Sequence, residues 1–234
     1  MKRKFLVLVL ILLATQGFSQ GVELYVGYPI RFPDKSTAYK SREGRNLNNV
    51  QAGFSFNTYI RSVSLQFGLG YLSDNYQFKY THSTPNLDER SLSVHNNYVN
   101  FTFMVYPKLY ADGKNVVSLG VGGNLLFPQN GKARYTYDDG TETVGPHGGN
   151  YFVVVMPRVS VRYSRWLGKS FYFFANANTD ITVMPAYEKN QYKGDKYFST
   201  AILSVDAGVG YFLHRKKGMK QPRYFQPWKK KVKE

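Results

Sequence analysis

The chain has 234 residues, a formal net charge of +16, 20 tyrosines, 17 phenylalanines and no cysteine. The length suits one domain, and the lack of cysteine excludes disulfides, thiolate chemistry and cysteine-bound metals. A mean hydropathy of −0.39 excludes a helical membrane protein, whereas tyrosine and phenylalanine at this density favour β-strands and suit membrane–water boundaries.

The N-terminus has the pattern of a secretory signal peptide, which we assign to residues 1–19. Three cationic residues precede the continuous apolar run Phe5–Leu13, and the small residues Gly17 and Ser19 favour cleavage before Gln20. This apolar run is far shorter than the ~20 residues that a spanning helix needs. The sequence therefore predicts an exported protein, with an N-terminal membrane anchor as the alternative interpretation.

Eight later stretches alternate large apolar residues with small polar ones, and this period of two is the repeat of a β-strand. In Val63–Tyr71 (VSLQFGLGY) one face carries Val, Leu, Phe, Leu and Tyr, and the other carries only Ser, Gln and Gly. Because the polar face is small and uncharged, it predicts a crowded, enclosed interior, with the apolar face turned toward lipid. The eight predicted strands are Val22–Ile30, Val50–Tyr59, Val63–Tyr71, Tyr98–Tyr106, Val116–Phe127, Tyr151–Tyr163, Phe171–Val183 and Thr200–Phe212.

The connections between these strands alternate between long polar segments and short turns. This alternation is typical of outer-membrane barrels, because their periplasmic turns are short and their extracellular loops are long. The predicted extracellular loops are Arg31–Asn49, Asp74–Ser93, Pro128–Asn150 and Met184–Ser199. The flanks of the second loop still alternate, so its two strands are predicted to continue as a hairpin beyond the membrane.

The predicted fold class is all-β: an eight-stranded antiparallel up-and-down transmembrane β-barrel over residues 20–213. The pattern resembles the small outer-membrane barrels of the OmpX and OmpA-transmembrane type, and the porin-family barrels of Bacteroidota. The segments VSLQFGLGY, VSLGVGGNL and LSVDAGVGYF carry this resemblance. It implies a Gram-negative outer membrane, contact with its lipid, and assembly by the barrel insertion machinery. The alternative fold is a soluble lipocalin-like barrel with an apolar interior.

Strand parity points a set of polar side chains into the barrel lumen. Eight strands leave an interior filled by side chains, and buried charges must pair. We therefore predict a structural polar network, with an ion path or gate as the alternative. Its predicted members are Glu23, Arg158, Arg162, Asn176, Asn178, Asp180 and Asp206.

Four tyrosines stand at the ends of the strands that run toward the periplasm in this topology. Aromatic residues are enriched where a barrel wall meets the membrane–water interface. The sequence therefore predicts a periplasmic aromatic girdle, made of Tyr59, Tyr106, Tyr163 and Tyr211.

The loop residues that could carry chemistry match no catalytic triad and no metal-ligand spacing. These residues are His82, Ser83, His95, Asp138, Asp139 and His147. No enzyme activity, cofactor or metal site is therefore predicted. The sequence favours a non-enzymatic barrel whose long loops present an interaction surface to an unknown extracellular ligand, and the alternative is a narrow channel or transport component.

Residues 214–234 form a basic tail with nine Lys or Arg and one Glu, which is half of the net charge of the chain. The tail is predicted to lie in the periplasm, because the last strand ends there. A charge run of this kind is usually solvated, and the alternative is contact with anionic lipid or cell-wall carboxylates. Nucleic acid is not an expected partner of an exported protein.

Overall fold

The structure, a computed structural model, describes residues 19–32, 42–60, 62–80, 89–137, 139–146, 153–168, 170–181, 201–213 and 223–227. The elements are β1 (Ser19–Phe32), β2 (Arg42–Asn46), β3 (Val50–Ile60), β4 (Val63–Tyr80), β5 (Glu89–Ala111), β6 (Asn115–Tyr137), β7 (Glu142–Pro146), β8 (Val154–Gly168), β9 (Phe171–Ile181), β10 (Ala201–Phe212) and the 3-10 helix η2 (Arg223–Phe225). No helix in this part of the chain is long and apolar enough to cross a membrane. The predicted loop Met184–Ser199 and nearly all of the predicted signal peptide lie outside the described residues.

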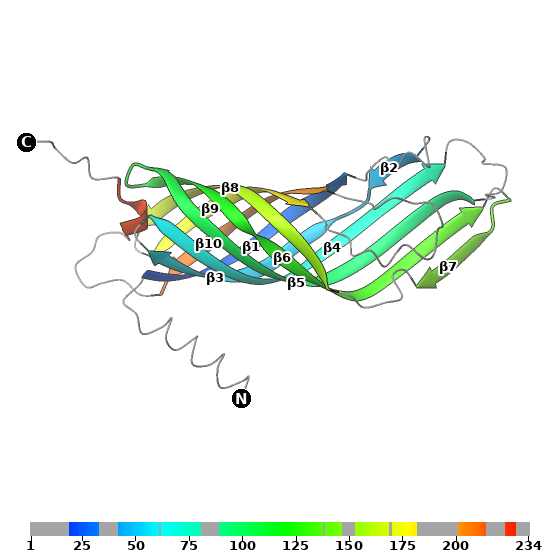
Figure 1. The fold of residues 1–234 in the computed structure, drawn as a ribbon, viewed down its shortest axis with the longest axis horizontal. Coiled ribbons are helices and arrows are strands. Elements are labelled where there is room, and N and C mark those ends of the chain that lie inside the picture. The colour runs from blue at the N-terminus through cyan, green and yellow to red at the C-terminus, as the bar shows by residue number, and fades with distance from the viewer. Residues whose placement is uncertain are drawn as a thin grey trace, which may run out of the picture.

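Eight of these strands form a closed ring. Their order around it is β4-β3-β1-β10-β9-β8-β6-β5, and pairing of β4 with β5 closes the ring. Every neighbouring pair is antiparallel, including the first and last strands, which pair from Gly21↔Phe212 to Phe32↔Ala201. The predicted eight-stranded antiparallel up-and-down barrel is therefore confirmed (Figure 1). We call the end with the short turns the turn end, and the opposite end the loop end.

Strands β4, β5 and β6 continue past the ring at the loop end and form a projecting sheet (Figure 1). Strand β5 pairs with β4 as far as Lys79↔Ser91, which confirms the predicted hairpin extension. On one side β2 pairs with β4, from Arg42↔Tyr80 to Asn46↔Tyr76. The prediction that residues 31–49 form only a loop is therefore wrong for the part that becomes β2.

The predicted loop Pro128–Asn150 is also wrong over most of its length. Strand β6 runs through it to Tyr137, and β7 returns to pair with β6 from Thr136↔Glu142 to Lys132↔Pro146. A register shift in the β5–β6 pairing leaves Gln129 unpaired beside Pro128. Proline is tolerated in a sheet at such bulges, so the turn-forming residues here bend the strand without ending it.

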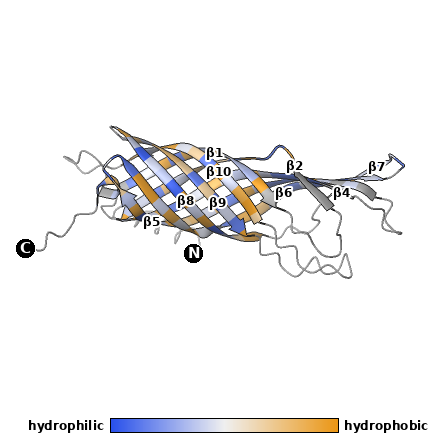
Figure 2. Cartoon of the chain, turned by 90° about the horizontal axis from the view of Figure 1, so that it is seen from above, coloured by the Kyte–Doolittle hydropathy of each residue, from blue (hydrophilic) through white to orange (hydrophobic). Residues whose placement is uncertain are grey.

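Hydrophobic and hydrophilic residues alternate along the strands of the ring (Figure 2). The exposed fractions place the apolar side chains on the outside of the wall and the polar ones inside. Strand β8 alternates residue by residue: Val155, Val159 and Val161 are each 52% exposed, while Arg158 and Arg162 are buried. This arrangement contradicts the soluble lipocalin-like alternative, which requires an apolar interior. It is the alternation that a lipid-facing barrel requires.

Two apolar clusters lie inside the barrel, one toward each end. The cluster toward the loop end consists of Leu72, Leu126, Met156 and Ile202. The cluster at the turn end is mostly aromatic and includes two residues from beyond the last strand; its members are Tyr59, Ala111, Val116, Tyr172, Phe174, Phe212, Tyr224 and Phe225. The polar part of the lumen lies between these clusters.

Candidate functional site

All seven residues predicted to line the lumen are in the interior, and each is at most 8% exposed. They come from β1, β8, β9 and β10, and their side chains point inward because they occupy alternate positions of those strands. The structure brings six of them into three hydrogen-bonded groups. The seventh, Asn176, is buried, and its Oδ1 atom has no hydrogen-bond partner.

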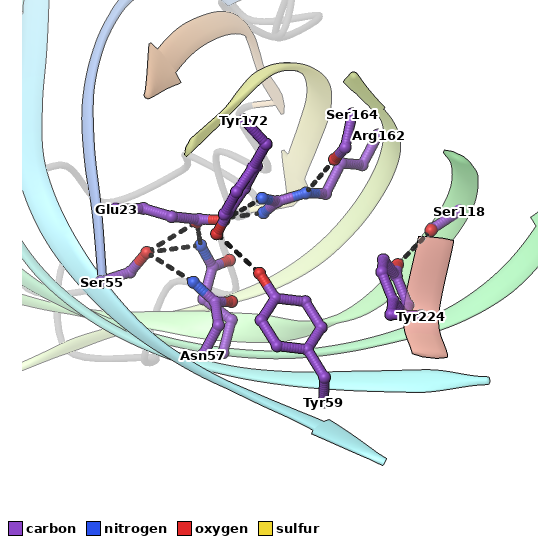
Figure 3. Close-up of polar contacts among 10 residues, drawn as sticks. Glu23, Ser55, Asn57, Tyr59, Ser118, Arg162, Ser164, Tyr172 and Tyr224 are labelled. Atoms are coloured by element: carbon purple, nitrogen blue, oxygen red, sulfur yellow. Dashed lines mark hydrogen bonds and ion pairs between the residues drawn. The ribbon is translucent and has the colours of Figure 1, made fainter. Parts of the chain in front are cut away.

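The first group is built around the carboxylate of Glu23, which forms an ion pair with Arg162 (Figure 3). Arg162 Nη1 also donates to Glu23 Oε2 at 3.2 Å. Tyr172 donates its hydroxyl to Oε1 at 2.6 Å, and Ser55 Oγ and Gln66 Nε2 each donate to Oε2 at 2.9 Å. The carboxylate thus accepts charged and neutral donors from four strands, which is what a buried charge needs.

Aromatic rings surround the guanidinium of Arg162. The guanidinium carbon lies 4.4 Å from the centre of the Phe174 ring and 5.3 Å from that of Tyr106. These distances are within the range of a cation–π interaction, which is stronger when the cation is desolvated. On the turn-end side, the hydroxyls of Tyr59 and Tyr172 lie 2.6 Å apart.

The second group begins with a bidentate pair between neighbouring strands. Arg158 Nε and Nη2 donate to Asp180 Oδ1 and Oδ2, each at 2.7 Å. Asn124 Nδ2 also donates to Asp180 Oδ1, at 3.1 Å. A fork-to-fork geometry of this kind fixes the relative position of both side chains.

The third group is built around Asp206, which has no arginine hydrogen-bonded to it. Its carboxylate accepts from Gln51 Nε2, and from Asn178 Nδ2 at 2.6 Å. Asn178 Nδ2 also donates to Ser204 Oγ at 3.1 Å. Amide side chains therefore hold the buried carboxylate of Asp206.

The chemistry open to these groups is limited. A guanidinium does not lose its proton in a protein, so the two arginines act as fixed positive charges and cannot serve as proton-transfer groups. Both are held by carboxylates. Among the described residues, no group of three or more His, Asp or Glu could hold a metal ion.

Sequence reasoning missed the neutral partners of the three groups. Its list of charged and amide residues omitted several hydrogen-bonding side chains, namely Gln51, Ser55, Gln66, Asn124 and Tyr172. The signal was available, because each occupies an inward position by the same strand parity. What parity could not supply is which inward residues reach one another across the lumen.

The prediction of a periplasmic aromatic girdle is wrong for two of its four members. Tyr163 and Tyr211 face outward and are 37% and 43% exposed, but Tyr59 and Tyr106 are 5% and 1% exposed and lie inside. Even-numbered residues such as Phe54 face outward in β3, so the odd-numbered Tyr59 faces inward. Odd-numbered residues such as Phe103 face outward in β5, so the even-numbered Tyr106 faces inward.

Glycines explain how such large rings fit inside the barrel. A Cβ atom added to Gly210 would lie 2.0 Å from Cζ of Tyr172, and one added to Gly120 would lie 2.4 Å from Cε1 of Tyr106. Neither distance is possible between a Cβ atom and a ring carbon to which it is not bonded. The small polar face of the strands is therefore where inward tyrosines lie against the backbone of the neighbouring strand.

The loop residues considered for catalysis are not brought together in the described part of the chain. His95 is exposed on β5, in register with Asn75 and Lys132. Asp139 accepts hydrogen bonds from the hydroxyl and N–H of Thr141, and these lower the pKa of Asp139. His82, Ser83, Asp138 and His147 lie outside the described residues.

No family model and no curated protein matches the chain. Among solved structures, it is similar to Ail of Yersinia pestis, at 8% identity over 84% of this chain and 99% of that one, with a TM-score of 0.47. Neisserial surface protein A (NspA) gives 12% identity over 84% and 99%, with a TM-score of 0.43. OprG of Pseudomonas aeruginosa gives 11% over 85% and 96%, also with 0.43. These scores carry no functional argument, and the barrel assignment rests on the strand pairing above.

Proposed function

We propose that this protein is an integral barrel of a Gram-negative outer membrane, that it is not an enzyme, and that it presents an interaction surface outside the cell on a closed lumen. The observation that carries the proposal is the distribution of side chains across one wall. The wall is apolar outside and holds paired charges inside.

The outer face supports insertion in lipid. Leu24, Val26, Val205 and Val209 are between 52% and 63% exposed on adjacent strands. Contiguous apolar surface on this scale marks an interaction or membrane site in a folded protein. In lipid the same surface is removed from water, and the transfer free energy favours this by about 25 cal/mol for each Å² buried.

The inner face supports a closed lumen. The Glu23–Arg162 pair crosses it, the Arg158–Asp180 pair lines it, and an apolar cluster lies toward each end. An ion that entered would have to break charge pairs that are already satisfied. A narrow channel is therefore the weaker alternative, and the experiment below separates the two.

The projecting sheet supports the interaction role. Within the described residues β7 pairs only with β6, so one edge of β7 offers backbone donors and acceptors to a partner. His95, Lys132, Arg134 and Val144 are exposed on this sheet. The proposed partner is an extracellular ligand that binds there. The basic residues after Pro227 would lie on the other side of the membrane, beside anionic lipid or cell-wall carboxylates.

The test is a conductance measurement on the purified full-length protein in planar lipid bilayers, with a general porin as the positive control. We expect no single-channel steps and no swelling of sugar-loaded liposomes. The variant Arg158→Ala/Arg162→Ala removes the cation of each ion pair and serves as the second arm. Porin-like conductance in the wild type would overturn the closed lumen, and conductance in the variant alone would identify the ion pairs as what closes it.

A further inference from the structure

Residues 223–227 lie at the mouth of the barrel at the turn end, although the last strand ends at Phe212 (Figure 1). Within this segment Tyr224 is 2% exposed and Phe225 is fully buried. The charge of the tail predicts that it is solvated, and this prediction is wrong for Tyr224 and Phe225.

An aromatic pocket holds the two rings. The centre of the Tyr224 ring lies 5.0 Å from that of Tyr59. The Phe225 ring lies 5.5 Å from Trp166, 5.8 Å from Tyr172 and 6.0 Å from Phe212. These separations are those of favourable tilted and edge-to-face aromatic pairs.

Polar contacts fasten the same segment. The Tyr224 hydroxyl is hydrogen-bonded to Ser118 Oγ inside the barrel (Figure 3). Lys108 Nζ donates to the backbone carbonyl oxygens of Tyr224, at 3.2 Å, and Gln226, at 2.9 Å. The barrel thus binds the segment through both its side chains and its backbone, which a chance contact of a solvated tail would not require.

The pocket exists only in the closed ring. Its residues come from six different strands, namely Tyr59 of β3, Lys108 of β5, Ser118 of β6, Trp166 of β8, Tyr172 of β9 and Phe212 of β10. A segment that binds the closed ring and not the open chain stabilises the closed ring by linkage. It also covers the lumenal network, because Tyr59 and Tyr172 lie between Tyr224 and the Glu23 carboxylate.

We propose that residues 223–227 form an intramolecular stopper that docks after the ring has closed, fastens it, and shuts the lumen at the turn end. That this end faces the periplasm rests on the proposed function, but the docking does not. The stopper accounts for the adjacent aromatic residues Tyr224 and Phe225 within a tail of high positive charge.

The natural absence of cysteine allows a direct test in detergent micelles. Ser164→Cys places a thiol at a buried lumenal position on β8, close to the turn end. We expect a charged maleimide to label it at least ten times faster in the Tyr224→Ala/Phe225→Ala variant than with the natural tail. The matched control is Gln226→Ala/Pro227→Ala, which keeps the backbone carbonyl that Lys108 binds, and should label slowly.

Equal labelling rates in the aromatic and control variants would overturn the stopper. A second readout is the temperature at which each barrel loses its compact mobility in SDS gels, which we expect to fall only in the aromatic variant. If that variant does not fold, Lys108→Met keeps the rings, removes one fastening, and should still label several times faster than wild type. The wild-type conductance test is separate, so failure of the stopper and failure of the proposed function give different results.

Discussion

Arg162 and Glu23 form an ion pair across the lumen, although β9 and β10 separate their strands in the ring. The pair therefore joins parts of the wall that share no backbone hydrogen bonds. Ser55, Gln66 and Tyr172 complete the shell of the carboxylate, so its removal from water is offset by several donors.

Arg162→Ala should destabilise the barrel by about 3–5 kcal/mol, because it leaves a buried carboxylate without its cation. Glu23→Gln/Arg162→Met should cost less than the sum of the two single changes, since neither charge is then stranded. Urea unfolding in micelles, arranged as a double-mutant cycle, measures the difference. Simple additivity would show that the pair does not act as a unit.

A charge on the outer wall should be costly only within the membrane. Phe67→Arg or Val121→Arg should lower the unfolding free energy in liposomes by ~2–4 kcal/mol, as arginine does near the bilayer midplane. The matched control is Val144→Arg, because Val144 is 58% exposed on β7, beyond the ring. Equal losses at all three positions would contradict the lipid-facing assignment.

Much of this architecture could be predicted from the sequence, because a period of two is a local property. The eight strands, their order and the inward charges follow from it. The girdle prediction includes Tyr59 because it lies at the end of a strand, although the alternation along that strand points its side chain inward. The docking of Tyr224 could not be predicted, since its partner Ser118 is 106 residues away and no local pattern links them. Likewise, Pro128 signals a turn until the pairing of β6 with β5, and the bulge in β6 at Gln129, are known.

Two of the turns that contain a left-handed glycine, at Gly113 and Gly140, should differ in their access from outside the cell. A protease site inserted beside Gly140, between β6 and β7, should be cut on intact cells. The same site beside Gly113, in the turn from Asp112 to Asn115, should be cut only after the outer membrane is opened. Both glycines have a positive φ, +82° at Gly140 and +100° at Gly113, so the two insertion sites are matched as glycine-containing turns. Cleavage in the opposite order would invert the topology.

Acid should weaken the turn that contains Asp112. Its Oδ1 accepts the backbone N–H groups of Lys114 and Asn115 at 2.8 and 2.7 Å, and Oδ2 accepts from Asn115 Nδ2 at 2.8 Å. Bonds from Asn115 above all lower the pKa of Asp112 from 3.8 to about 2. The stabilisation is therefore present above pH 3.8 and is lost as the pH falls through 2.

Unfolding temperatures measured between pH 5 and pH 2 provide the check on Asp112. We expect the wild type to lose more stability over this range than Asp112→Asn, which keeps an acceptor oxygen but does not titrate. Parallel pH profiles for the two proteins would contradict the assignment.

Two truncations should separate the two roles of the tail. A chain ending at Pro227 keeps the stopper but loses Lys229, Lys230, Lys231 and Lys233. It should keep the SDS resistance of the full chain and bind anionic vesicles more weakly, since each lysine near such a surface contributes ~1 kcal/mol. A chain ending at Leu213 should lose both properties. Vesicle binding that is unchanged at low salt in the first truncation would contradict the electrostatic contact.

In the proposed orientation, the projecting sheet also sets how far from the membrane the proposed partner would bind. Strand β6 leaves its β8 neighbour at Leu126 and continues to Tyr137. At ~3.4 Å per residue, those strand residues carry the β6–β7 tip about 35 Å along the strand past the last wall contact. That reach exceeds the depth of a lipid headgroup layer. A partner that is too large to touch the membrane, or that surface carbohydrate keeps away from it, can therefore still reach the tip. A shortened hairpin would bind only smaller partners.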